Sequence, residues 1–378
     1  MPNTALGAAK KAKNDEFYTQ YYDIEKEMNA YLEYDENVFR DKVVLCPCDD
    51  PEWSNFTRYF AQNFEKLGLK KLISTSYAIK SKNVAMEWSP TLFESENPKY
   101  DIKKSDTHGK IFILDRDSDN NGRIDLNDLQ WDYLEGDGDF RSEEVKAIRE
   151  QADIIATNPP FSLFREFLKW IVEAGKSFAI IGNQNAITYK EVFPLIKENK
   201  IWLGKGFPGG AAHFYSPYED IAVASDHREG MIRVSGVMWF TNIEHGRRHQ
   251  PLQLMTMKDN IKYSKHKEVK GIGYQKYDNY DAIEVPYTDA IPSDYDGAMG
   301  VPISFLDKYC PEQFEILGMC ENENLYGLKT RKYTSEECRQ AYFDKFGKKG
   351  TYDLNASGVL IESGRKEKVY QRILIHKK

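Results

Sequence analysis

The chain has 378 residues with a formal net charge of −7, and 41% of its residues are hydrophobic and 29% charged. This length suffices for one large α/β domain and a smaller second one, and no stretch approaches the roughly 20 apolar residues of a membrane span, so no membrane partner is expected. Five scattered cysteines and a polar, lysine-bearing N-terminus argue against a secreted, disulfide-bonded protein and indicate the cytoplasm.

The first half of the chain alternates short apolar runs, which are typical of strands, with segments whose apolar residues recur at helical spacing. Such alternation predicts an α/β fold with a doubly wound, mostly parallel sheet of the Rossmann-like kind, covered by helices on both faces. The expected strands are residues 42–46, 71–76, 110–115, 153–157 and 177–182, and the expected helices are residues 55–67, 142–151 and a segment between a Ser162 cap and a Gly175 stop.

Chemically reactive residue types collect where these strands are expected to end. The three segments concerned are residues 46–55, 136–142 and 158–161. Ligands of open α/β sheets bind at the carboxyl ends of the strands. We therefore expect the three segments to form one ligand site.

After about residue 243 the alternation loosens, and tyrosine, glycine, proline and charged residues dominate. We therefore divide the chain into residues 1–243 and residues 244–378, with a separate recognition role for the second region. Between Arg247 and Lys276, eight basic residues stand against two acidic ones. This local charge suits contact with phosphates, although a solvated helix or loop face would show the same pattern.

Asn158, Pro159, Pro160 and Phe161 directly follow the strand expected at residues 153–157. The exocyclic amine of adenine is a poor nucleophile because its lone pair is delocalised into the ring. The side-chain carbonyl of Asn158 and the backbone carbonyl of Pro159 can accept hydrogen bonds from such an amine and localise the lone pair, with Phe161 as a stacking face. The alternative is a structural Asn-Pro-Pro turn, but a strand before it and a helix after it favour catalysis.

Several segments together resemble one family, the EcoRI-type adenine-specific DNA methyltransferases, over roughly the first two thirds of the chain. The similar segments are residues 14–19, 44–56, 136–142, 157–165 and 238–244. The resemblance implies a methyltransferase that moves a methyl group from S-adenosylmethionine to N6 of an adenine flipped out of double-stranded DNA. It also implies that residues 1–243 are the catalytic domain, that residues 244–378 recognise the target, and that a cognate restriction nuclease is a candidate partner.

The resemblance also assigns roles to individual residues. It implies cofactor contacts for Phe17, Tyr18, Thr19, Asp49, Asp50, Asp139 and Phe140. Contacts with the target base or DNA are expected for Trp239, Phe240, Arg247, Arg248, Lys262 and Lys265. For Trp239 and Phe240, an aromatic strand in the core is an equally good interpretation.

Other interpretations remain open. Residues 117–128 approach a calcium-binding loop, with Asp128 where that loop carries glutamate, although a polar turn-rich loop explains them too and no metal is expected. Asn-Pro-Pro motifs also serve methylation of RNA bases, cytosine N4 and protein glutamine. A non-catalytic calcium- or nucleic-acid-binding module is the alternative from another functional class.

Overall fold

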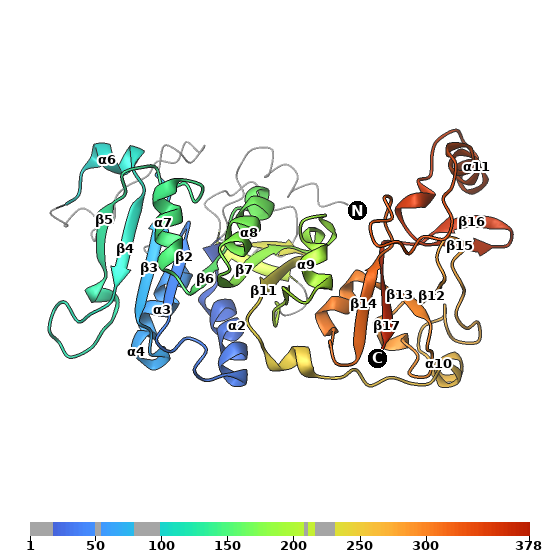
Figure 1. The fold of residues 1–378 in the computed structure, drawn as a ribbon, viewed down its shortest axis with the longest axis horizontal. Coiled ribbons are helices and arrows are strands. Elements are labelled where there is room, and N and C mark those ends of the chain that lie inside the picture. The colour runs from blue at the N-terminus through green and yellow to red at the C-terminus, as the bar shows by residue number, and fades with distance from the viewer. Residues whose placement is uncertain (1–17, 50–53, 79–98, 208–210, 216–230) are drawn as a thin grey trace. The chain divides into compact units, whose positions relative to one another are not determined.

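The computed structural model describes residues 18–49, 54–78, 99–207, 211–215 and 231–378 (Figure 1). These residues form two compact units. The first unit comprises Met1–Ile196 and Lys200–Gly246, and the second comprises Lys197–Asn199 and Arg247–Lys378. The division predicted from the sequence lies nearby, at residue 243. No helix in the described part of the chain is both long and apolar enough to cross a membrane.

The first unit is built on an eight-stranded sheet with the order β5-β4-β3-β2-β6-β7-β11-β8. The strands are β2 (Val43–Pro47), β3 (Lys71–Ser76), β4 (Lys110–Leu114), β5 (Gln130–Tyr133), β6 (Ile154–Thr157), β7 (Ser177–Asn183), β8 (Trp202–Leu203) and β11 (Val237–Thr241). The four central strands, β3, β2, β6 and β7, are parallel. The outer pairings, β3 with β4, β4 with β5, β7 with β11 and β11 with β8, are antiparallel.

The sheet is therefore mixed, and the strand expected at residues 110–115 runs against β3. Antiparallel neighbours need no crossover helix, so strand spacing along the sequence could not reveal this reversal. At the centre of the sheet, every residue of β2 and β6 is buried. Strands buried at every position are expected where helices cover both faces of a sheet.

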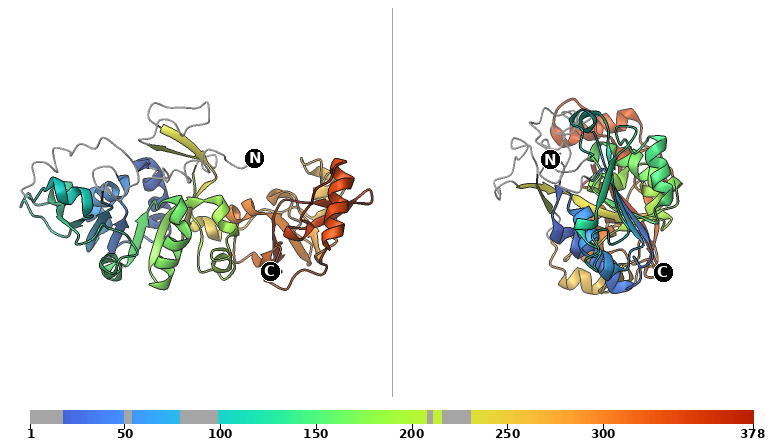
Figure 2. Two further views of the ribbon diagram at one scale, coloured as in Figure 1. Left: turned by 90° about the horizontal axis from the view of Figure 1, so that it is seen from above. Right: turned by 90° about the vertical axis from the view of Figure 1, so that its left-hand side faces the viewer.

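Helices lie on both faces of this sheet, with α2 and α3 on one side and α7 and α8 on the other (Figure 2). The helices of the first unit are α2 (Tyr21–Tyr34), α3 (Asn55–Gln62), α4 (Phe64–Leu67), α6 (Ile102–Thr107), α7 (Glu143–Gln151) and α8 (Phe164–Glu173), and α9 (Phe193–Lys197) ends in the second unit. The Ser142 hydroxyl accepts a hydrogen bond from Val145 N and caps α7, so the helix begins one residue after the start that the sequence predicts.

Two helix boundaries differ from those that the sequence predicts. The helix expected at residues 55–67 is divided into α3 and α4 at Asn63, whose side chain donates a hydrogen bond to Tyr59 O and so competes with the helical backbone pattern. The Ser162 cap is also wrong. Residues Phe161–Leu163 form a 3-10 turn after the two prolines, so α8 begins at Phe164 with Leu163 in the N-cap position.

A small sheet of β1 (Tyr18–Thr19), β9 (Ala211–Tyr215) and β10 (Met231–Ser235) belongs to the same unit. Thr19 pairs with Phe214 across about 200 positions of sequence in this sheet. The pairing matters for the site because it fixes the start of the described chain on a strand from much later in the sequence.

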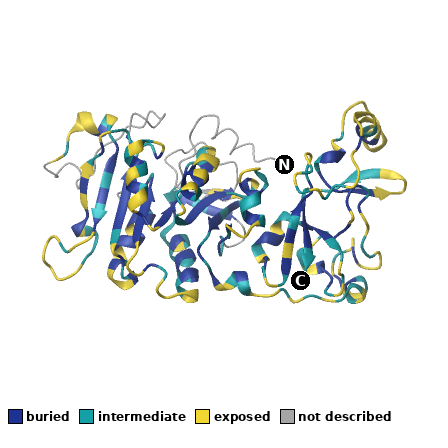
Figure 3. Ribbon diagram, in the orientation of Figure 1, coloured by how far each residue is buried: buried dark blue, intermediate teal, exposed yellow. Residues whose placement is uncertain are grey.

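The second unit has its own sheet, with the order β12-β13-β17-β14, and a separate two-stranded sheet of β15 and β16. Its strands are β12 (Ala282–Glu284), β13 (Ala298–Pro302), β14 (Phe314–Met319), β15 (Val359–Glu362), β16 (Arg365–Lys368) and β17 (Arg372–Lys377), and its further helices are α10 (Met257–Tyr263) and α11 (Ser335–Phe346). Buried residues line the four-stranded sheet, whereas α11 is largely exposed and the β15–β16 hairpin is buried at its base, at Val359 and Leu360, and exposed at its tip (Figure 3).

Candidate active site

The candidate site lies where the strand order of the large sheet reverses. From β2 the chain continues to β3 on one side, and β6 later pairs on the other side of β2. A crevice at such a switch point, beyond the carboxyl ends of the strands, is the usual ligand site of open α/β sheets. The Thr157 hydroxyl donates a 2.7 Å hydrogen bond to Pro47 O, which joins the ends of β6 and β2.

Cys48 and Asp49, directly after β2, are held in place although neither is a glycine. Cys48 adopts a left-handed conformation with φ of 64°, which costs a non-glycine residue about 1 kcal/mol. Asp49 is only 7% exposed, and its Oδ1 accepts a 2.5 Å hydrogen bond from the Ser54 hydroxyl. Its backbone N–H donates to Thr75 O of β3. Asp49 therefore places a buried, oriented carboxylate at the switch point. Asp50 lies outside the described residues.

Asn158 and Thr19, which the sequence assigned to catalysis and cofactor binding, are in direct contact. Asn158 Nδ2 donates to Thr19 Oγ1 at 3.2 Å. Thr19 is itself buried, and its carbonyl accepts a 2.8 Å hydrogen bond from Asn55 Nδ2 at the start of α3. The strand β1 and the helix α3 thus hold the residue that orients the Asn158 amide. Phe17 lies outside the described residues.

The loop containing Asp139 is fastened to the end of β3. Ala78 N donates to Asp137 O, and the Tyr77 hydroxyl donates to Asp139 Oδ2 at 2.7 Å. Gly138 has φ of 84°, and a Cβ atom there would collide with Ser76 O. A residue with a side chain would therefore disturb both the backbone of this loop and the position of Asp139.

Asp139 is a carboxyl group of the site with a clearly perturbed pKa. Burial by itself raises its pKa, but hydrogen bonds from Arg141 and Tyr77 outweigh burial and lower the pKa to about 2. Arg141 grips the carboxylate from both sides, with Nη2 at 2.6 Å from Oδ2 and its backbone N at 2.8 Å from Oδ1. The group is thus a fixed anion at neutral pH.

The aromatic residues assigned to stacking are deeply buried. Phe140 packs edge-on against Phe167 and Trp170 of α8. Trp239 and Phe240 are at most 1% exposed in β11, where Trp239 stacks on Phe207 and Phe240 packs against Phe164. For these residues, burial favours the packing interpretation. Phe161 is also buried, with 8% of its surface exposed.

Comparison with known proteins bears on what this site does. A family model described as adenine-specific methyltransferase EcoRI matches residues 5–378. The chain belongs to this family. It is 44% identical to the type II methyltransferase M.EcoRI of Escherichia coli over 83% of this chain and 89% of that protein.

Two mycoplasma proteins are also similar. The type II methyltransferase M.MpnI of Mycoplasma pneumoniae is 34% identical over 86% of this chain and 89% of its own length. The type II methyltransferase M.MgeORF184P of Mycoplasma genitalium is 33% identical over 86% of this chain and 90% of its own length. No solved structure matches the chain. As a member of the EcoRI family, the chain is a DNA methyltransferase that depends on S-adenosylmethionine.

The residues present fit this cofactor. S-adenosylmethionine carries a cationic sulfonium, an adenine amine that donates hydrogen bonds and an amino acid end. The switch point offers the ionised Asp139 carboxylate, the buried Asp49 carboxylate and the Thr19 hydroxyl on three adjacent segments. Negative charge suits the cationic sulfonium, and hydrogen-bond acceptors suit the adenine amine.

The basic residues that the sequence assigned to DNA are mostly engaged within the second unit. Arg247 forms a 2.6 Å ion pair with Asp307, and Lys265 forms a 2.8 Å ion pair with Asp289. Arg248 is 7% exposed and donates to Asn199 Oδ1. Lys262 is exposed and lies over the ring of Tyr263. Local charge in the sequence therefore overstates the charge that this segment offers to a ligand.

The loop with the calcium-like spacing does bring carboxylates together. Oxygen atoms of Asp117, Asp119 and Asp128 all lie within 4.8 Å of one another, the one such group of three among the described residues. Asp128 accepts hydrogen bonds from backbone N–H groups of Asp125 and Ser118, which lower its pKa. These bonds account for the position of Asp128 without a metal, so both interpretations of the loop remain.

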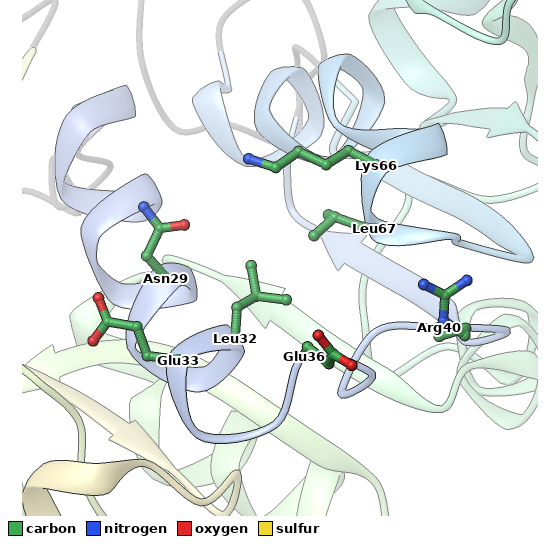
Figure 4. A pocket seen from close by; sticks show the side chains of 7 residues that line it. All are labelled: Asn29, Leu32, Glu33, Glu36, Arg40, Lys66 and Leu67. Carbon is green, nitrogen blue, oxygen red and sulfur yellow. The ribbon is translucent and has the colours of Figure 1, made fainter.

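One pocket of the first unit lies away from the switch point. It measures about 510 Å³ and is lined by Asn29, Leu32, Glu33, Glu36, Arg40, Lys66 and Leu67 (Figure 4). The end of α2 and the end of α4 precede β2 and β3, so this pocket lies at the amino ends of the strands. Ligand binding in such sheets occurs at the opposite ends.

Sequence reasoning missed four residues that shape the site: Thr157, Asn55, Tyr77 and Arg141. Tyr77 directly follows β3, so the rule that ligands bind at carboxyl ends of strands could have identified it. Thr157, Asn55 and Arg141 lie inside segments that the resemblance covers. Nothing in the local sequence identifies the contact of Arg141 with Asp139.

Proposed function

We propose that the chain transfers a methyl group to N6 of an adenine flipped out of double-stranded DNA at a specific sequence. The observation that carries this proposal is the placement of Asn158 and Pro159 directly after β6 at the switch point, with Asn158 bonded to Thr19. The same end of the sheet offers Asp49 and Asp139 to a cofactor, so the acceptor amine and the methyl donor would have adjoining positions.

The role of Asn158 and Pro159 follows from the chemistry of the amine. Two carbonyl acceptors aimed at an NH2 group draw its hydrogens out of the ring plane and make the lone pair available. Positive charge that develops on the nitrogen is stabilised by the same oxygens, which are oriented before the reaction begins. The two prolines hold the turn rigid, because a proline ring fixes φ.

Three segments are proposed to hold S-adenosylmethionine. Asp139 would accept a hydrogen bond from the amine of the cofactor's adenine. Thr19 would contact the methionine end of the cofactor, and Asp49 would lie beside its ribose or its sulfonium. When bound, the cofactor supplies an electrophilic methyl group on sulfur. Arg141, whose side chain is 52% exposed, would turn aside to leave room at Asp139.

The second unit is proposed to recognise DNA. An adenine in a duplex reaches the site only when it leaves the base stack. Unstacking and unpairing cost a few kcal/mol, which contacts of the flipped base with the protein offset. Phosphate contacts hold the duplex without specifying sequence, and the exposed Lys262 suits them better than the buried Arg248. Because the relatives are named type II methyltransferases, we also propose a cognate restriction nuclease as partner, and the cytoplasm as location.

Identification of the methylated product tests the proposal. The full chain is incubated with labelled S-adenosylmethionine and, separately, duplex DNA, RNA and protein, and the digested products are resolved by mass spectrometry. The expected product is N6-methyladenine from duplex DNA. Methylation only at cytosine N4, on RNA or on protein glutamine would overturn it, and no label transfer at all would contradict catalysis.

A further inference from the structure

The β15–β16 hairpin differs from every other strand pair of the second unit. Its strands pair only with each other, with Val359 opposite Lys368 and Glu362 opposite Arg365. Ser363 and Gly364 both have positive φ, at 50° and 80°, which makes a tight two-residue turn. The tip, residues 361–365, is exposed, and the hairpin extends away from the four-stranded sheet (Figure 1).

The helix α11 supports this hairpin. Lys345 forms an ion pair with Glu367 of β16, and Lys366 lies 3.9 Å from Glu337 of α11. The Tyr352 hydroxyl donates to Lys368 O. These contacts fix the hairpin against the helix, so the two elements form one body, the ribbon–helix element (residues 334–368).

The ribbon–helix element carries seven basic and six acidic residues, a net charge of +1, and the acidic Glu336, Asp344, Asp353 and Glu362 are exposed. Its internal ion pairs use Glu337 and Glu367. Four further cations, Arg339, Lys348, Lys349 and Arg365, are exposed, and no carboxylate of the described residues lies within 4.0 Å of them. In contrast, Arg247 and Lys265 of the basic segment already have acidic partners at 2.6 and 2.8 Å.

We propose that the ribbon–helix element is a DNA-reading element, with its hairpin in the major groove. The major groove admits a two-stranded ribbon, and DNA phosphates are a ligand that the exposed Lys348 and Lys349 suit, although the net charge of the element is only +1. Arg365, beside Glu362 at the tip, would contact base edges, where arginine recognises guanine. Lys348 and Lys349, just after α11, would contact phosphates. This inference rests on duplex DNA being the substrate, as proposed above.

The phosphate contacts are tested by the salt dependence of binding. The double variant Lys348→Ala, Lys349→Ala should weaken binding to all duplexes alike and reduce the slope of log affinity against log salt by about 1.8, since each contact contributes about 0.9. The matched control is Lys66→Ala, Lys70→Ala, which removes the same charge at the amino ends of the sheet and should leave the slope unchanged.

The base contact is tested by mapping methylated adenines genome-wide. Arg365→Ala should relax discrimination at one position of the site by about 10- to 100-fold, while cofactor binding and thermal unfolding stay at the wild-type values. The inference is overturned, and the proposed function stands, if the wild-type protein methylates duplex adenines but the ribbon–helix variants behave like it. In that case they would keep the wild-type DNA affinity, the wild-type salt dependence of binding and the wild-type methylation sites. If the wild-type protein does not act on duplex DNA, both fail.

Discussion

The carboxyl ends of β2 and β6 and the basic segment at residues 247–276 illustrate two kinds of sequence signal. Both were assigned roles from short stretches of sequence. At the carboxyl ends of these strands, Asn158 contacts Thr19, and Asp49 lies two residues after β2, while the roles assigned to these residues stay predictions. In the basic segment, Arg247 and Lys265 are paired with carboxylates, and Arg248 is buried. A motif anchored to the end of a strand therefore predicts position, whereas a count of charges does not.

The largest effect is expected from a change that disturbs the backbone of the loop containing Asp139. Gly138→Ala introduces a Cβ atom that collides with Ser76 O in a left-handed conformation, and should lower the free energy of unfolding by about 2–4 kcal/mol and displace Asp139. Gly122→Ala is the control, because Gly122 has nearly the same φ with nothing near its Cβ position, and should lose only about 1 kcal/mol. Urea unfolding distinguishes them, and equal losses would contradict the described packing.

A smaller effect is expected when the contact between the two predicted residues is removed. Thr19→Val deletes the hydroxyl that accepts from Asn158 Nδ2 and should slow single-turnover methyl transfer about 10-fold, equivalent to about 1.4 kcal/mol, the net value of one hydrogen bond. Thr19→Ser restores the hydroxyl and should restore most of the rate. A slow serine variant would show that the methyl group matters, and not the hydrogen bond.

In the basic segment, we expect Arg248 to contribute to stability and Lys262 to contribute to DNA binding. Arg248→Ala removes a buried side chain that donates to Asn199 and should lower the free energy of unfolding by about 1–3 kcal/mol without changing the salt slope of DNA binding. Lys262→Ala should do the reverse, with unchanged stability and a slope reduced by about 0.9. Chemical denaturation and binding titrations measure both. A reduced salt dependence of DNA binding for Arg248→Ala would show that Arg248 contacts DNA and would contradict this prediction.

The smallest expected effect concerns pH. The pKa of Asp139 is lowered from 3.8 to about 2, so its carboxylate adds to the stability of the folded state above about pH 4 and loses that contribution as the pH falls toward 2. The affinity for S-adenosylmethionine should therefore not depend on Asp139 titration between pH 5 and 9. Calorimetric titration across this range checks it, with Asp139→Asn as comparison. A wild-type decline near pH 6 that the variant lacks would contradict the low pKa.

Much of the catalytic unit was predictable because its signals are local. Apolar runs marked β2, β3, β6 and β7 nearly to the residue, and Ser142 marked the start of α7. The antiparallel β4 and the pairing of β1 with β9 depend on contacts distant in sequence, which local periodicity does not encode. The grip of Arg141 on Asp139 and the pairing of Arg247 with Asp307 likewise depend on where the fold places an opposite charge.

The central claim is that Asn158 acts on the acceptor amine and not on cofactor binding. Asn158→Ala separates the two when single-turnover methyl transfer to duplex DNA and the dissociation constant for S-adenosylmethionine are both measured, with the exposed Asn127→Ala as control. The account predicts a transfer rate reduced about 10²–10³-fold, with cofactor affinity within a few-fold of wild type. A variant that transfers methyl groups at the wild-type rate would contradict it.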